Sequence, residues 1–146
     1  MSLSNNGVLD PTILREYDIR GIVGETLSPD DVRALGRGFG SIIFEKHGAA
    51  SRVAVGYDGR LSSPMLLSAL IDGLLSSGVH VINTGLGPSP MLYFATFETC
   101  SQGGMMITGS HNPPNYNGIK LIQEGKPFYG RAIQSLGTRV RNREFV

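Results

Sequence analysis

The sequence predicts a layered α/β domain in which helices cover one β-sheet. Three observations point to this fold class: short apolar runs alternate with segments of helical periodicity, glycine or proline separates most of them, and the length suits one core. The chain has 146 residues. A chain of this size buries roughly 68% of its unfolded surface when it folds. One domain is therefore the expected organisation.

The first elements follow from local signals near the N-terminus. Residues 1–12 are predicted to be a disordered leader, so the folded domain is expected over 13–146. A bent strand is predicted within Leu14–Leu27, where glycines interrupt the apolar residues. A helix is then predicted from a cap at Ser28 to a stop at Gly48, because proline and two acids open it and apolar residues recur at helical spacing.

The same alternation continues to the end of the chain. Short apolar runs predict three buried strands and an extended return, over Arg52–Tyr57, Val79–Asn83, Gly103–Thr108 and Ile119–Gln123. Helical periodicity predicts three further helices, which begin at Ser63, Ser89 and Arg131. Strands that alternate with helices in this way favour a sheet with helices on both faces.

The composition excludes several classes of protein. The chain has 13 Lys and Arg against 12 Asp and Glu, a formal net charge of +1, which argues against binding to nucleic acid or membranes through bulk charge. Cys100 is the only cysteine, so an internal disulfide is ruled out and a reducing compartment fits. No apolar run approaches the roughly 18 residues of a membrane span. These features predict a cytoplasmic protein with no nucleic-acid or membrane partner.

The polar loop over 108–118 is the least ordinary stretch. It holds Ser110, His111, three asparagines and two prolines directly after a predicted buried strand, where layered α/β domains present functional groups. A hydrolase elbow is disfavoured, because Asn112 stands where G-x-S-x-G requires glycine. A phosphoryl acceptor needs an exposed hydroxyl near cationic donors, and Lys120 follows across the loop. The alternative is an Asx-type turn whose side chains satisfy local backbone groups.

Arg20 is the second candidate. It precedes Gly21, which permits close backbone approach, and an arginine can bind a phosphate with two parallel hydrogen bonds. The alternative is that Asp18 and Arg20 are solvated charges on an outward strand face. In a regular strand Tyr17 and Arg20 face opposite sides. Both can therefore reach one site only if this segment bends.

Five segments, in this order, resemble the first domain of the α-D-phosphohexomutase family: Glu16–Gly21, Val55–Arg60, Pro88–Pro90, Thr108–Pro113 and Asn117–Lys120. The resemblance extends from about Leu14 to the end of the chain. It implies a three-layer α/β/α fold with a mixed four-stranded sheet, as the first domain of a four-domain enzyme. That enzyme interconverts hexose 1-phosphate and hexose 6-phosphate.

The resemblance also implies a role for each candidate residue. Ser110 corresponds to the serine that gives a phosphoryl group to a sugar monophosphate and takes one back from the hexose 1,6-bisphosphate, which is both intermediate and activator. Lys120 assists proton transfer at the sugar hydroxyl, and Arg20 is an active-site arginine. Substrate-binding roles fall to Tyr17, His111 and Asn112. Asp58 and Arg60 match a further family turn, for which we expect a supporting structural role.

The implied cofactor is Mg²⁺, to which the phosphate on Ser110 contributes one oxygen of the about six that hard cations require. The implied partners are the hexose phosphate substrate and the remaining domains of the full-length chain, which supply the other metal ligands and read the sugar. We therefore expect residues 1–146 alone to show no mutase turnover and no tight Mg²⁺ site. The alternative function is a non-catalytic phosphosugar-binding or interaction module.

Overall fold

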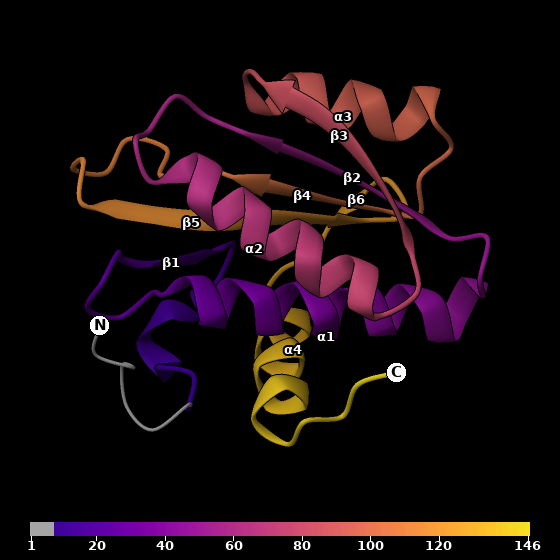
Figure 1. The fold of residues 1–146 in the computed structure, drawn as a ribbon, viewed down its shortest axis with the longest axis horizontal. Helices are drawn as coiled ribbons and strands as arrows, with labels where there is room; N and C mark the ends of the chain where they lie inside the picture. The colour runs from indigo at the N-terminus through magenta and orange to yellow at the C-terminus, as the bar shows by residue number, and fades with distance from the viewer. Residues whose placement is uncertain (1–7) are drawn as a thin grey trace.

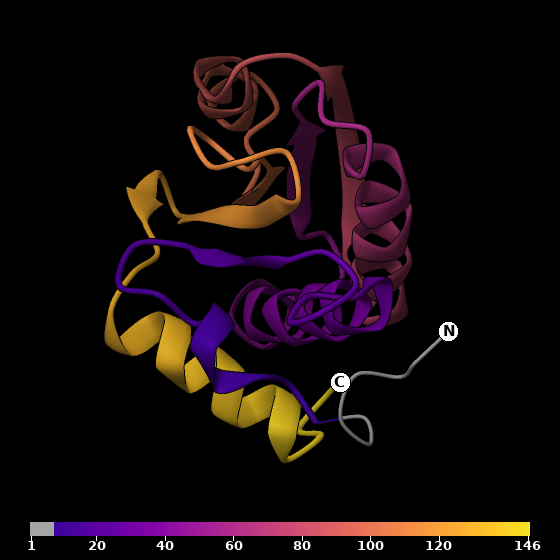
Figure 2. The same cartoon turned by 90° about the vertical axis from the view of Figure 1, so that its left-hand side faces the viewer.

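One mixed β-sheet forms the centre of the molecule, with helices on both of its faces (Figure 1; Figure 2). The computed structural model describes residues 8–146. The strands are β1 (Ile19–Ile22), β2 (Arg52–Tyr57), β3 (His80–Leu86), β4 (Gly103–Ile107), β5 (Tyr116–Gln123) and β6 (Lys126–Pro127). The helices are the short 3-10 helix η2 (Pro11–Ile13) and the α-helices α1 (Pro29–His47), α2 (Ser63–Ser76), α3 (Ser89–Glu98) and α4 (Arg131–Arg141).

The strand order is β1-β5-β4-β2-β3, and β6 pairs with the C-terminal end of β5. Strand β2 runs parallel to both β3 and β4, whereas β5 runs antiparallel to β4 and β1. The sheet is mixed as predicted, but it has six strands instead of four, because β1 and β6 extend β3-β2-β4-β5 at the β5 edge. The predicted three-layer α/β/α class is confirmed.

The face of the sheet under α1 and α2 carries the main hydrophobic core. Leu35 and Phe39 of α1 and Leu70 of α2 are fully buried in it, and α4 packs along the outer side of α1 (Figure 2). Helices α1 and α2 approach closely at Gly73, where an added Cβ would lie 2.0 Å from the carbonyl oxygen of Arg33. Glycine is therefore required at this crossing.

Helix α3 covers the opposite face. Leu92 of α3 packs on Ala54, Met106 and Ile122 of the sheet, which form a second and smaller buried cluster. The outer side of α3 carries the apolar side chain of Phe97, and this residue is 76% exposed. No helix within residues 8–146 combines the length and the apolar character that crossing a bilayer requires.

The sequence predicted the start of α1 correctly, and the boundaries of some other elements differ. Ser28 and Asp31 form a capping box before α1. The first strand is shorter than the predicted Leu14–Leu27 segment, because the chain bends over residues 16–18 and turns again after Ile22. Strand β3 continues to Leu86, and β5 already begins at Tyr116.

The predicted leader over residues 1–12 is corrected at its C-terminal end. Residues 1–7 lie outside the described residues. Leu9 is buried in the core, and Asp10 caps η2 by accepting a hydrogen bond from the Thr12 amide. Burial of Leu9 fixes this segment against the domain, so the fold takes in residues that precede position 13.

Candidate active site around the Ser110 loop

The serine loop, residues 108–115, connects β4 to β5 at the edge where the parallel strands β2 and β4 end. Ser110 is partly exposed, and its backbone adopts a left-handed conformation with φ of +53°. For a residue other than glycine this conformation costs about 1–2 kcal/mol. The surrounding structure must therefore hold Ser110 in place.

The amide groups at the start of the serine loop are held by Asp58, which directly follows β2. The Gly109 amide donates to Asp58 Oδ2 at 3.0 Å, and the Ser110 amide donates to Thr108 Oγ1 at 3.1 Å. The Asp58 carboxylate and the Thr108 hydroxyl thus fix two successive amides.

Several hydrogen bonds converge on the Asp58 carboxylate. Burial raises the pKa of Asp58, but hydrogen bonds from the Ser63 hydroxyl, the Arg60 amide, the Gly109 amide and Thr108 outweigh burial, so its pKa lies below the ordinary value. The shortest of these bonds comes from Ser63 Oγ at 2.6 Å, at the start of α2. The carboxylate is therefore ionised at neutral pH and links α2 to the serine loop.

The carbonyl groups of the same loop are held by Arg60. Its guanidinium donates to the carbonyl oxygens of four residues: from Nη1 to Pro113 at 2.6 Å and Tyr116 at 3.1 Å, and from Nη2 to Ser110 at 3.1 Å and Asn112 at 2.7 Å. The side chain of Arg60 is only 15% exposed. An added Cβ at Gly109 would lie 2.2 Å from Arg60 Nε, so the missing side chain of this glycine makes room for the guanidinium.

Arg20 approaches the serine loop from β1. Strand β1 pairs with β5, and Arg20 lies opposite Gly118. Its guanidinium forms an ion pair with Asp18. With the Asn112 amide oriented so that its oxygen faces Arg20, that oxygen accepts hydrogen bonds from Nη1 and Nε, each at 2.9 Å. The structure therefore brings Arg20 together with the residue two positions after Ser110.

Lys120 lies further along β5, opposite Met106 of β4. It lines a cavity of about 220 Å³ between the sheet and α3, together with Tyr17, Tyr93 and Phe97. Tyr17 stands in the bend before β1. The structure thus brings Lys120 and Tyr17 together in one cavity, whereas Ser110 and Arg20 are not among the residues that line it.

Ser110 and Asn112 line a separate, shallower hollow of about 340 Å³ with Asp58 and Arg60. His111 is exposed on the same loop. Among residues 8–146, no group of three or more His, Cys, Asp and Glu side chains is arranged to hold a metal ion. Because Mg²⁺ prefers near-octahedral oxygen coordination, these residues do not by themselves form its site.

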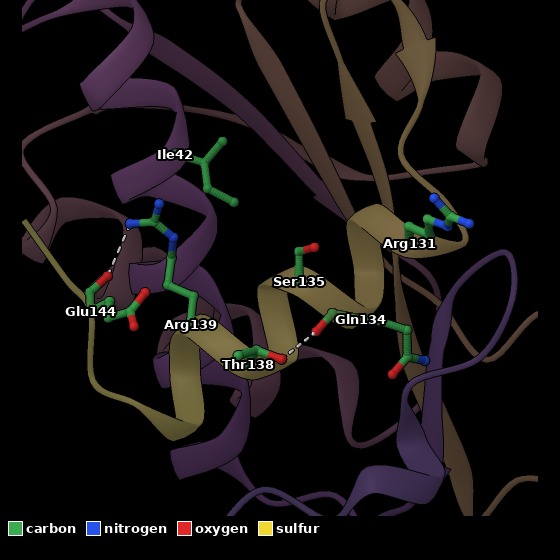
Figure 3. A pocket seen from close by; sticks show the side chains of 7 residues that line it. All are labelled: Ile42, Arg131, Gln134, Ser135, Thr138, Arg139 and Glu144. Atoms are coloured by element: carbon green, nitrogen blue, oxygen red, sulfur yellow. Dashed lines mark hydrogen bonds between the residues drawn. The ribbon is translucent and has the colours of Figure 1, made fainter.

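A third hollow, of about 600 Å³, lies on α4 away from the serine loop (Figure 3). Its side chains pair mostly with protein groups: Arg139 binds both carboxylate oxygens of Glu45 at 3.0 Å and the Glu144 carbonyl oxygen at 3.0 Å. The Thr138 hydroxyl donates to the Gln134 carbonyl. This hollow shares no lining residue with the Lys120 cavity or with the Ser110 hollow.

Thr108 and Asn117 hold the site, but the sequence did not predict them as site residues. The Thr108 hydroxyl accepts a hydrogen bond from the Ser110 amide. Asn117 is fully buried, and its side-chain amide donates to Ser62 Oγ at 2.9 Å and Ser63 Oγ at 3.0 Å. The sequence signal near these residues was the Asp-Gly-Arg turn at 58–60, directly after a buried strand. That this turn lies beside the serine loop follows from the pairing of β2 with β4, which the sequence does not show.

Comparisons with known proteins agree with the three-layer α/β/α fold. Residues 11–146 match the family model described as phosphoglucomutase/phosphomannomutase, alpha/beta/alpha domain I. The chain is 47% identical over 134 residues to a phosphoglucomutase of Neisseria gonorrhoeae, and this match covers 92% of the chain and 29% of the relative. It is 41% identical over 146 residues to a phosphomannomutase/phosphoglucomutase of Pseudomonas aeruginosa, and that match covers 100% of the chain and 31% of the relative.

A solved structure is also similar. The crystal structure of a phosphoglucomutase/phosphomannomutase family protein from Burkholderia thailandensis superimposes with a TM-score of 0.89 at 40% sequence identity. The match covers 94% of this chain and 31% of that one. The chain therefore spans less than a third of the length of these relatives.

Proposed function

Because this chain belongs to the phosphoglucomutase/phosphomannomutase family, we propose that it is the phosphoryl-carrying domain of a phosphohexomutase and that Ser110 is the carrier. The supporting observation is the state of Ser110 in the serine loop. Ser110 lines a hollow, its amide donates to Thr108 Oγ1, and its carbonyl accepts from Arg60. The preceding Gly109 amide donates to Asp58, and Arg20 is bonded to Asn112. A hydroxyl held in this way is suited to accept and return a phosphoryl group.

The proposed reaction interconverts hexose 1-phosphate and hexose 6-phosphate in two transfers. In the first, the bond between phosphorus and Ser110 Oγ breaks and a bond to the free sugar hydroxyl forms, which gives hexose 1,6-bisphosphate. In the second, the other phosphoryl group of that bisphosphate moves to Ser110 Oγ, and the product monophosphate leaves. Free hexose 1,6-bisphosphate acts as activator, because it can phosphorylate Ser110 directly.

Two cationic side chains are assigned roles in these transfers. Arg20 stabilises the negative charge that spreads over the transferring phosphoryl group. Lys120 assists the movement of the proton between the sugar hydroxyl and the serine oxygen. Tyr17, His111 and Asn112 are proposed to contact the substrate. Lys120 and Tyr17 line one cavity, which supports a shared role of these two residues.

The remaining parts of the reaction belong to the full-length chain. The relatives are about three times as long as the matched segment, and we propose that the remaining domains complete the sugar site. The same domains would supply the ligands of Mg²⁺ that the described residues lack. A cytoplasmic location is part of the proposal, and the single cysteine of the chain supports it.

Substitution of the carrier tests the proposal. In the full-length protein, Ser110→Ala is expected to abolish conversion of a panel of hexose 1-phosphates, because no hydroxyl remains to carry the phosphoryl group. Ser68→Ala, at an exposed position on α2, is the matched control and should keep full turnover. If Ser110→Ala kept the biological activity of the protein, a non-catalytic phosphosugar-binding or interaction module would be the better description.

A further inference from the structure

Arg60 has a role that the proposed reaction leaves unassigned. We propose that Arg60 is a positioning residue, whose guanidinium holds the serine loop in the conformation that presents the Ser110 hydroxyl and does not bind the phosphoryl group. This inference rests on the proposed function of Ser110, but its structural part is tested independently of phosphoryl transfer.

The first argument is geometric. Three of the four carbonyl oxygens that Arg60 contacts belong to the serine loop and the fourth to Tyr116 at the start of β5, so the loop curves around a single guanidinium. Four N–H groups in one rigid plane fix the relative positions of these carbonyls. The ammonium group of a lysine has three donors on one flexible atom and cannot reproduce this pattern.

The second argument concerns Ser110 itself. Its left-handed backbone is disfavoured for a residue with a side chain. The peptide groups on both sides of Ser110 are fixed, since its amide binds Thr108 Oγ1 and its carbonyl binds Arg60 Nη2. Without Arg60, we expect rotation into a more common backbone region, which moves the hydroxyl away from its present direction.

The third argument excludes Arg60 as the phosphate ligand. An arginine has five N–H groups. Four of the Arg60 groups bind carbonyl oxygens, and the fifth, on Nε, faces Asp58 Oδ2 at 3.5 Å. A phosphate could recruit Arg60 only by breaking bonds that shape the loop. Arg20, whose guanidinium binds the side chains of Asp18 and Asn112, can exchange them for a phosphate more readily.

NMR on the 146-residue chain tests the structural part. Arg60→Lys and Arg60→Ala are compared with Arg52→Lys, a matched control at the opposite end of β2 whose Nη1 donates to the Thr99 carbonyl at 2.9 Å. In both Arg60 variants, we expect Ser110 to lose the chemical shifts of a left-handed residue. The Gly109 and Ser110 amides should exchange about tenfold faster. Amides of α1, and the Gly109 and Ser110 amides in Arg52→Lys, should be unchanged.

Two further readouts separate positioning from a general contribution to stability. Millimolar guanidinium ion added to Arg60→Ala should restore the Ser110 shifts. In the full-length enzyme, Arg60→Lys should lower kcat and leave KM nearly unchanged, because the residue acts on Ser110 and not on the sugar.

Three results would overturn the proposal. The first is an unchanged Ser110 signal in both Arg60 variants. The second is a loss of protection spread equally over the whole chain, which would make Arg60 a stability residue only. The third is a rise in KM alone. If Ser110 proved not to carry phosphate, the NMR result would still stand, so the two failures can be told apart.

Discussion

The two sides of the serine loop are built from similar charges that are used differently. On one side, Arg60 and Asp58 bind backbone groups, and the Arg60 side chain is only 15% exposed. On the other side, Arg20 binds the side chains of Asp18 and Asn112 and is 26% exposed. Backbone partners fix the path of the chain, whereas side-chain partners can rotate away when a ligand arrives. The side with Arg60 and Asp58 therefore shapes the serine loop, whereas the side with Arg20 carries a cation whose partners are side chains.

The largest expected effect comes from removing Arg20, the arginine whose partners are side chains. In the full-length enzyme, Arg20→Ala should lower turnover by about 10²- to 10³-fold, the range found when one electrostatic group that stabilises a transition state is lost. The melting temperature of the domain should change little. Steady-state kinetics and thermal unfolding check the two halves of this expectation.

Arg33→Ala is the matched control for Arg20→Ala. Arg33 also pairs with acidic side chains, but it lies exposed on α1, away from the serine loop. It should keep full turnover. If Arg20→Ala unfolded the domain and Arg60→Lys did not affect the loop, the assignment of the two sides would have to be reversed.

A smaller effect, on stability, is expected from Asp58. Asp58→Asn removes the charge that accepts hydrogen bonds from the Ser63 hydroxyl and the Gly109 amide. We expect a loss of about 1–3 kcal/mol in the free energy of unfolding, because partly buried donors lose their acceptor. Urea denaturation of the 146-residue chain measures it.

The exposed Asp72 provides the control for Asp58. Its contact is an ion pair with Arg33 on the surface, so Asp72→Asn should change the free energy of unfolding by less than about 1 kcal/mol. Equal losses in the two variants would show that Asp58 contributes no more than a surface charge.

The smallest effect is a pH dependence. The pKa of Asp58 in the folded chain lies below the ordinary value of 3.8, so its ionised form contributes stability that is complete above that value. The contribution is lost as the pH falls below 3.8 toward the native pKa, where the folded chain also takes up the proton. Unfolding measured across this acidic range should therefore depend less on pH in Asp58→Asn. An identical pH dependence in both chains would contradict the hydrogen-bonded role of the carboxylate.

Much of the fold could be predicted because its signals are local. Ser28, Pro29 and the following acids specify the start of α1 within a few residues, and the apolar run Arg52–Tyr57 coincides with β2. The signal for the end of the serine loop is not local. Tyr116 and Asn117 look like loop residues, but they pair with Ile22 and Gly21 across the chain, so β5 begins earlier than its apolar run.

The site was predicted in part for the same reason. The motif containing Ser110 is contiguous and could be recognised, whereas the contacts of Arg60 with the serine loop span about fifty residues and depend on β2 lying beside β4. Lys120 follows Ser110 closely in sequence, yet the cavity that it lines with Tyr17 is set by the strand pairing and by α3. Spacing along the chain did not determine this placement.

Phosphopeptide mapping of the purified full-length protein, before and after incubation with hexose 1,6-bisphosphate, tests the carrier role of Ser110 most directly. The expected result is one phosphoryl group on Ser110 that increases on incubation and disappears when hexose monophosphate is added in excess. An active mutase with no phosphate at Ser110 under either condition would contradict it.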